Sequence, residues 1–150
     1  MAKMVKVGMA DLNICHSPDA ITTLGLGSCV GVALYDKNTK TAGLVHVMLP
    51  DSTKVRQNQN RAKFADTGID YLIELLEKEG AKKSSLTAKI AGGAQMFAFS
   101  SSNDMLRVGE RNVEAVKDKL KKLGIRILAE DTGLNYGRTV EFYPETGDFI

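Results

Sequence analysis

The stretch Gly25–Leu49, which reads GLGSCVGVALYDKNTKTAGLVHVML, decides the fold of this chain. It contains two runs rich in β-branched and apolar residues, Val30–Tyr35 and Gly43–Leu49. The segment Asp36-Lys-Asn-Thr between them is typical of a hairpin turn, so we expect two antiparallel neighbouring strands. A turn centred near residues 38–39 places opposite each other those positions whose numbers sum to about 77.

A cysteine and a histidine lie in this hairpin. Cys29 follows a glycine-rich turn and directly precedes the first run, and His46 lies inside the second run. A thiol at a tight turn is expected to point outward beside backbone N–H groups, here around Gly27 and Ser28, which can stabilise an oxyanion. Cys29 and His46 differ from direct pairing by about one or two residues, which brings an imidazole within reach of the thiol. The pattern indicates cysteine-dependent acyl transfer.

Two other interpretations of these residues compete with catalysis. A single cysteine in an apolar segment is commonly a small buried hydrophobe, and a strand histidine is commonly a hydrogen-bonded core residue. The spacing Gly25-x-Gly27-x-x-x-Gly31 suggests nucleotide binding, but it misses the dinucleotide fingerprint by one position. A strand follows it instead of a helix whose N-terminus could bind phosphate, so the nucleotide interpretation is disfavoured.

Composition excludes several classes of protein. Lys and Arg total 20 against 18 for Asp and Glu, so the net charge is only +2, which argues against nucleic acid or an anionic membrane as partner. Cys15 and His16, next to the turn Ser17-Pro18-Asp19, form no paired ligand motif and are interpreted as structural or surface residues. We therefore expect no metal site and no cofactor. No signal peptide or membrane-spanning run is present, which predicts a cytoplasmic protein whose thiols stay reduced.

The remaining sequence predicts one mixed α and β domain spanning residues 1–150. Two helices are expected, Phe64–Glu79 and Asn112–Leu123, because apolar residues recur there at helical spacing. Each is followed by a glycine that favours helix termination. Short runs rich in β-branched residues predict strands at Met4–Val7, Ala20–Leu24, Val30–Tyr35, Gly43–Leu49, Thr87–Ala91, Ile125–Glu130, Arg138–Phe142 and Asp148–Ile150.

Two motifs carry a resemblance to a known family. Thr23-Leu-Gly-Leu-Gly-Ser-Cys29-Val-Gly-Val and Gly43-Leu-Val-His46-Val-Met-Leu-Pro50-Asp51-Ser52 resemble the CheD family of chemoreceptor glutamine deamidases. The resemblance covers roughly residues 4–148. Further matching motifs are Ala65-Asp66-Thr67-Gly68, Lys89-Ile-Ala-Gly-Gly-Ala94, Gly109-Glu110-Arg111-Asn112-Val113-Glu114-Ala115-Val116 and Ala129-Glu130-Asp131-Thr132-Gly133.

The resemblance implies a fold and a reaction. The expected fold is an α+β layered sandwich of mixed β-sheets with helices on one outer face, related to cysteine hydrolases of the cytotoxic necrotizing factor type. The expected reaction converts receptor glutamines to glutamates. Cys29 would be the nucleophile, His46 the base, and Thr23 the residue that orients the imidazole. We expect the imidazole to lower the pKa of the thiol by forming an ion pair with it.

The resemblance also implies partners and leaves alternatives open. Methyl-accepting chemotaxis receptors would be the substrate, and the CheC phosphatase would be a binding partner. The chain could instead act mainly as a regulatory module that stimulates CheC, or as a receptor methylesterase. The polar loops Pro50–Arg61 and Phe99–Met105 are candidates to border the active site. In the second region Met96, Phe97 and Phe99 are candidate anchors for CheC, although Met96 and Phe97 are equally well explained as the end of a buried strand.

Overall fold

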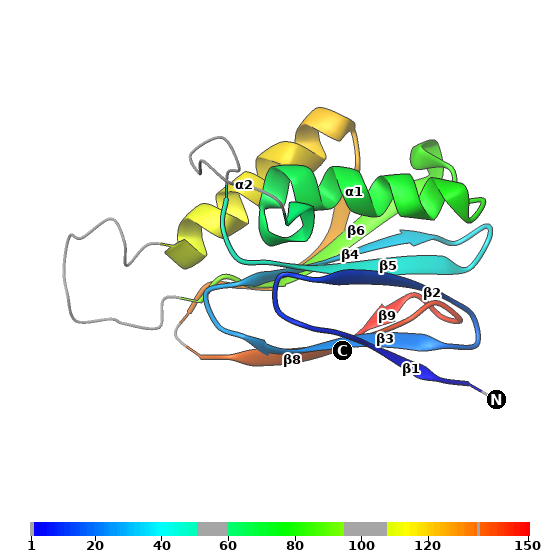
Figure 1. Cartoon of the computed structure of the whole chain (residues 1–150), viewed down its shortest axis with the longest axis horizontal. Coiled ribbons are helices and arrows are strands. Elements are labelled where there is room, and N and C mark those ends of the chain that lie inside the picture. The colour runs from blue at the N-terminus through cyan, green and yellow to red at the C-terminus, as the bar shows by residue number, and fades with distance from the viewer. Residues whose placement is uncertain (1, 51–59, 95–107, 135) are drawn as a thin grey trace.

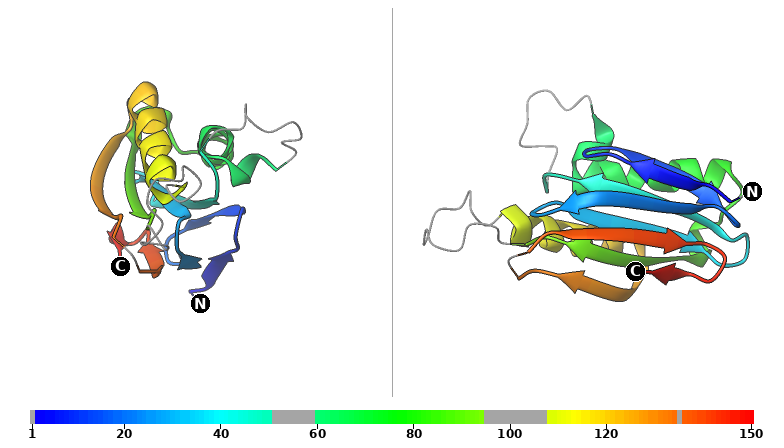
Figure 2. Two further views of the ribbon diagram at one scale, coloured as in Figure 1. Left: turned by 90° about the vertical axis from the view of Figure 1, so that its left-hand side faces the viewer. Right: turned by 90° about the horizontal axis from the view of Figure 1, so that it is seen from below.

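The computed structural model describes residues 2–50, 60–94, 108–134 and 136–150. These residues form three layers: a four-stranded sheet, a five-stranded sheet packed against it, and helices on the outer face of the five-stranded sheet (Figures 1 and 2). The expected α+β sandwich of mixed sheets with helices on one outer face is thereby confirmed. Within the described ranges, no helix is long and apolar enough to cross a membrane.

The five-stranded sheet is the central layer. Its β6 and β7 are parallel and are joined across the outer face by a helix, whereas its other neighbours are antiparallel. The order across this sheet is β2 (Leu12–His16), β5 (Thr41–Val47), β4 (Val30–Asp36), β6 (Leu86–Gly92) and β7 (Arg126–Thr132).

The four-stranded sheet covers the inner face of the central layer. In it β1 and β3 are parallel, and β8 is antiparallel to both β3 and β9. The β3–β8 register shifts between Thr23 and Leu26, an irregularity of the kind that re-aims side chains near a site. The order across this sheet is β1 (Met4–Val7), β3 (Ala20–Leu26), β8 (Arg138–Tyr143) and β9 (Asp148–Phe149).

The hairpin β4–β5 has the register expected from its turn. Val30 pairs with Val47, and Gly31 pairs with His46. β4 lies between β5 and β6 and is buried almost throughout. Successive side chains of the hairpin therefore pack into two different hydrophobic clusters. Val32 and Val45 face the helices. Ala33 and Leu44 face the four-stranded sheet.

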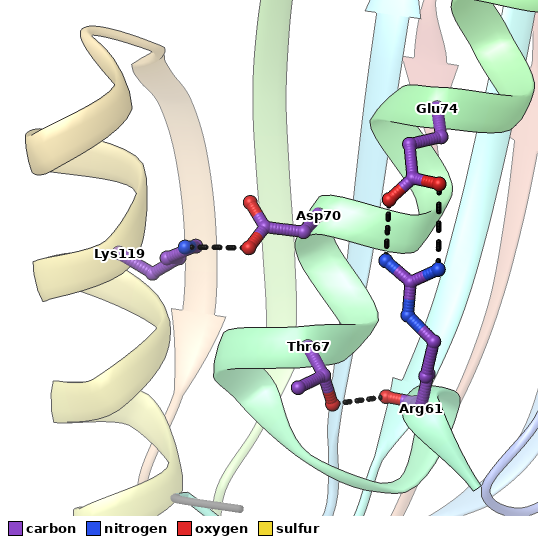
Figure 3. Close-up of polar contacts among 5 residues, drawn as sticks. All are labelled: Arg61, Thr67, Asp70, Glu74 and Lys119. Carbon is purple, nitrogen blue, oxygen red and sulfur yellow. Dashed lines mark hydrogen bonds and ion pairs between the residues drawn. The ribbon is translucent and has the colours of Figure 1, made fainter.

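Two α-helices cover the outer face of the central sheet. α1 (Ala65–Lys78) buries the predicted apolar stripe, including Ile69 and Leu72. α2 (Val108–Leu123) buries Val116 and Leu120 against the same core. Lys119 Nζ lies 2.9 Å from Asp70 Oδ2 and ties α2 to α1, as Figure 3 shows.

Polar contacts also fix the entry into α1. A short 3₁₀ turn at Arg61–Lys63 precedes the helix, and a second one, at Lys83–Ser85, precedes β6. The guanidinium of Arg61 pairs with Glu74, and the Arg61 carbonyl accepts a 2.7 Å hydrogen bond from the Thr67 hydroxyl (Figure 3).

Some elements differ from the prediction. β2 was not expected, because the only strand signal in Leu12–His16 is a short alternation beside a turn. It does place Cys15 and His16 on opposite faces, one buried and one exposed. α2 includes Val108–Arg111, before the predicted start at Asn112. The candidate anchors Met96, Phe97 and Phe99 and most of both predicted loops lie outside the described residues.

Candidate active site

Cys29 lies between β3 and β4, at the edge of the layer between the two sheets. Its side chain packs in a small cluster with Leu26, Ala91 and Val140, and only 8% of the residue is exposed. The expectation of an outward-pointing thiol is therefore wrong. The β3–β4 turn folds back against β6 and β8, because Leu26 and Val140 bury their own apolar surface there.

His46 and Thr23 meet across the two sheets. His46 comes from β5 of the central sheet and Thr23 from β3 of the four-stranded sheet, and both are buried. The Thr23 Oγ1 lies 2.7 Å from His46 Nδ1 and 2.8 Å from the carbonyl oxygen of Val7. The predicted orienting pair is thus in direct contact, and Val7 of β1 completes the chain of hydrogen bonds.

This chain determines which imidazole nitrogen carries the proton. A carbonyl oxygen can only accept, so the single hydroxyl hydrogen of Thr23 is donated to Val7. The Thr23 oxygen must then accept from an Nδ1–H of His46. In the neutral ring this leaves a lone pair on Nε2. That atom is buried and has no hydrogen-bond partner within the described part of the chain. His46 is therefore arranged to accept a proton at Nε2.

The thiol and the imidazole lie on the same face of the hairpin. His46 is directly opposite Gly31, and Cys29 is two residues before Gly31 along the chain. Cys29 lies one residue before β4, and in a regular ladder such a diagonal pair has Cα atoms about 7–8 Å apart. Gly31 has no side chain of its own, and the space above it is occupied by the side chain of Leu26 and the methyl group of Thr23. Of the three catalytic candidates from the sequence, the structure thus brings Thr23 and His46 into direct contact and places Cys29 beside the same hairpin, packed against Leu26, Ala91 and Val140.

Burial keeps both reacting groups neutral in the resting protein. It raises the pKa of the Cys29 thiol above its ordinary value, and a hydrogen bond from the residue's own backbone N–H only partly opposes this. Burial also lowers the pKa of His46. Because a low-dielectric site disfavours charge on either group, the resting pair is thiol and neutral imidazole. The pKa of Cys29 is thus raised, not lowered as the ion-pair expectation required.

The backbone around Cys29 is held by its carbonyl groups. The Gly27 carbonyl accepts from Ala94 N–H at 2.9 Å, and the Cys29 carbonyl accepts from Gly93 N–H at 2.8 Å. This approach requires glycine at position 92, where φ is +109° and an added Cβ would lie 2.2 Å from the Cys29 carbonyl oxygen.

The backbone N–H groups of the same turn differ in availability. Gly27 N–H donates to the Gly25 carbonyl at 3.0 Å and is therefore already engaged. The N–H groups of Ser28 and Cys29 donate to no other backbone group among the described residues. Of the predicted oxyanion residues, Ser28 keeps an available donor, and the Cys29 N–H, which faces its own sulfur, supplies a second one.

One residue of this site was not singled out from the sequence. Asn112 of α2 is fully buried, and its Nδ2 lies 2.9 Å from the carbonyl oxygens of both Ser28 and Met48. The sequence does contain a signal, because Asn112, Val116 and Leu120 are four residues apart and share a helix face. A polar residue on an otherwise apolar helix face indicates a specific partner.

The other cysteine and histidine lie away from this site. Burial, with a smaller contribution from Asp19, raises the pKa of Cys15 to about 12, which makes that thiol unreactive. His16 lies on the surface, with Nε2 3.0 Å from Glu79 and Nδ1 3.0 Å from Thr41 Oγ1. Among the described residues, no group of three or more His, Cys, Asp and Glu side chains is arranged to hold a metal ion.

Comparisons with known proteins show the family of this chain. Residues 48–150 match the family model described as CheD chemotactic sensory transduction. The chain is 69% identical over 150 residues to the probable chemoreceptor glutamine deamidase CheD of Lachnoclostridium phytofermentans, covering all of this chain and 93% of that one. It is 53% identical over 146 residues to the chemoreceptor glutamine deamidase CheD of Bacillus subtilis, covering 97% and 88% of the two chains.

A solved structure shows a weaker likeness. The crystal structure of the Bacillus licheniformis hypothetical protein YfiH is 15% identical, with a TM-score of 0.46, over 77% of this chain and 47% of that one. The family assignment rests instead on the full-length matches and on the family model. This chain belongs to the CheD family.

Proposed function

We propose that this protein is a glutamine deamidase that converts glutamine side chains of chemoreceptors to glutamates through a thioester on Cys29. The names of its full-length relatives support the substrate. The observation that carries the chemistry is the buried Nε2 of His46, which has a lone pair and no partner in the described structure, on the same sheet face as Cys29. A neutral base beside a neutral thiol suits a nucleophile that is activated only when substrate arrives.

The first half of the reaction forms the thioester. His46 Nε2 takes the proton from the Cys29 sulfur as the sulfur attacks the carboxamide carbon of the glutamine. The carbonyl oxygen becomes an oxyanion, which the N–H groups of Ser28 and Cys29 are available to bind. When the C–N bond breaks, the imidazolium returns the proton to the nitrogen, which leaves as ammonia.

The second half regenerates the enzyme. His46 takes a proton from water, and the hydroxide adds to the thioester carbon. The carbon–sulfur bond then breaks, the product is glutamate, and the Cys29 sulfur recovers a proton. Thr23 stabilises the imidazolium in both halves, because its hydroxyl oxygen faces Nδ1 and forms a stronger hydrogen bond to a charged ring.

Mass spectrometry of a receptor cytoplasmic fragment tests this proposal. Incubation with the protein in H₂¹⁸O should convert specific glutamines to glutamates that carry one ¹⁸O atom, and Cys29→Ala should not. An unmodified fragment would refute the proposal. Loss of methyl groups from methylated glutamates, with glutamines unchanged, would favour a receptor methylesterase.

Family membership supports a second role. We propose that CheC binds over the segment that carries Cys29, so that saturating CheC suppresses deamidation. We further propose that both activities occur in the cytoplasm, with residues 1–150 acting as one domain. Phe99→Ala should lower CheC affinity more than fivefold if this ring is an interface anchor. Calorimetric titration with CheC measures the affinity. Unchanged affinity with a lowered melting temperature would assign Phe99 to the core instead.

A further inference from the structure

Asn112 is a buried polar side chain whose orientation is fixed. Its Nδ2 faces two carbonyl oxygens at 2.9 Å, those of Ser28 and Met48. Carbonyl oxygens accept only, so the nitrogen and not the oxygen of the amide must face them. The Oδ1 atom is buried and has no partner among the described residues. The unpaired buried oxygen costs stability, and the two hydrogen bonds of Nδ2 offset this cost.

The two acceptors belong to the two segments that carry the reacting groups. Ser28 directly precedes Cys29, and Met48 is two residues beyond His46. A single amide group thus links the nucleophile turn to the end of the histidine strand. The Lys63 carbonyl, just before α1, accepts from the Met48 N–H at 2.8 Å, but within the described residues Asn112 of α2 is the side chain that bonds to both segments.

The bond to Ser28 has a geometric consequence for Cys29. The Ser28 carbonyl and the Cys29 N–H belong to one planar trans peptide and point in opposite directions. A donor that holds the carbonyl therefore aims the Cys29 N–H toward the other side of the turn. It also polarises the peptide, which makes the N–H a stronger donor. Ala94 N–H does the same for the preceding peptide by holding the Gly27 carbonyl, and so orients the Ser28 N–H.

Helix α2 is braced well enough to hold this peptide. Its first turn packs against the residues that follow β6, so closely that only glycine fits. A Cβ on Gly109 would lie 2.3 Å from the Ala94 carbonyl oxygen. Further along, Lys119 pairs with Asp70 of α1 at 2.9 Å (Figure 3). Val116 and Leu120 anchor the same face in the core.

We propose that Asn112 is a positioning residue that aims the Cys29 N–H at the oxyanion formed during deamidation. It acts through the Ser28–Cys29 peptide and does not touch substrate. This inference rests on the proposed function for its natural substrate. Its effect on the oxyanion site can nevertheless be measured without that substrate.

The test compares two reactions of the same sulfur. A receptor peptide that carries an aldehyde in place of the glutamine carboxamide adds the Cys29 thiol across its C=O bond, and the resulting oxygen occupies the oxyanion site. Alkylation by iodoacetamide displaces iodide and forms no oxyanion. Asn112→Ala should lower both kcat and aldehyde affinity by about 10- to 100-fold. It should leave KM and the alkylation rate within about threefold.

Two further variants separate positioning from folding. Val116→Ala removes a buried side chain from the same face of α2 and should lower the melting temperature without lowering aldehyde affinity. Asn112→Asp keeps the shape but loses both donors when ionised. Burial and two facing carbonyls raise the pKa of the introduced carboxyl, which regains one donor when protonated. Its aldehyde affinity relative to the parent should therefore rise as the pH falls from 8 to 6.

The outcomes are distinct. Parental aldehyde affinity in Asn112→Ala would overturn the inference, even if the parent deamidates receptors. Equal losses of aldehyde affinity and alkylation rate would also overturn it, because they would assign Asn112 to the general architecture. If the parent deamidates no receptor glutamine but Asn112→Ala still weakens aldehyde binding selectively, the proposed function fails and the role of Asn112 stands.

Discussion

Replacing Thr23 with valine removes one hydroxyl from the centre of the site while nearly preserving its shape. Thr23 is 1% exposed, and its oxygen serves both His46 Nδ1 at 2.7 Å and the Val7 carbonyl at 2.8 Å. In Thr23→Val the imidazole of His46 loses the hydroxyl oxygen that accepts a hydrogen bond from Nδ1–H and thereby keeps the proton on that nitrogen. The Val7 carbonyl oxygen loses its hydroxyl donor. We therefore expect both catalysis and stability to decrease.

The magnitudes follow from the two hydrogen bonds. The bond to Nδ1 becomes charge-assisted when His46 is protonated, and such bonds contribute about 1.5–3 kcal/mol. Its loss should lower kcat by about 10- to 100-fold, with little change in KM. In Thr23→Val the Nδ1–H of His46 remains buried without an acceptor, and the buried Val7 carbonyl oxygen lacks the hydroxyl donor. The free energy of unfolding should therefore fall by about 2–4 kcal/mol. Loss of Cys29 or His46 should be more damaging to kcat.

Thr23→Ser is the matched control. It keeps the hydroxyl and removes one methyl group, so kcat should stay within about threefold of the parent and stability should fall by about 1 kcal/mol. Steady-state deamidation of a receptor fragment gives kcat and KM, and urea unfolding gives the stability. Parental kcat in Thr23→Val would refute the orienting role. A loss of kcat in Thr23→Ser but not in Thr23→Val would show that packing of the methyl group matters instead.

Three other predictions concern Cys29 and His46. Cys29→Ala should abolish deamidation while lowering the unfolding free energy by only about 1 kcal/mol. The double variant with His46→Ala should lose no further activity, since the two residues act as one unit. Additive losses would contradict this. Iodoacetamide should alkylate Cys29 faster than Cys15, with a rate that keeps rising above about pH 8.5 because burial raises the Cys29 pKa; a plateau below pH 7 would instead reveal a preformed thiolate. The unfolded chain protonates His46 below about pH 6.5, whereas burial lowers the pKa of His46 in the folded chain. The free energy of unfolding of the parent, relative to that of His46→Gln, should therefore be constant above that pH. It should decrease as the pH falls toward 5, by at most about 1.4 kcal/mol per pH unit. A pH-independent difference would contradict a buried neutral imidazole.

Local patterns predicted much of the fold. The turn at Asp36 fixed the hairpin register, because a short turn leaves few ways to pair its flanking strands. The apolar stripes of both helices identified their buried faces. β2 was missed because its residues become a strand only by pairing with β5, and so depend on a partner distant in sequence.

Local pairing predicts the site only where its residues are close in sequence, and Thr23 was expected from the family resemblance alone. Cys29 and His46 share one hairpin, so their proximity follows from local pairing. The Thr23–His46 bond crosses from one sheet to the other, and no periodicity within a segment predicts such a contact. The expected helix begins at Asn112, whereas α2 begins at Val108, so Asn112 lies one turn inside the helix and on its buried face.

The packing of Val140 against Cys29 has a consequence for when the protein can first act. β8, which carries Val140, is synthesised after the elements that carry Thr23, Cys29, His46 and Asn112, and it pairs with the strand that holds Thr23. A nascent chain that has not yet produced β8 therefore lacks one wall around its thiol and the support of its orienting residue. We expect newly made protein to remain inert toward glutamines until this strand has been translated and has docked.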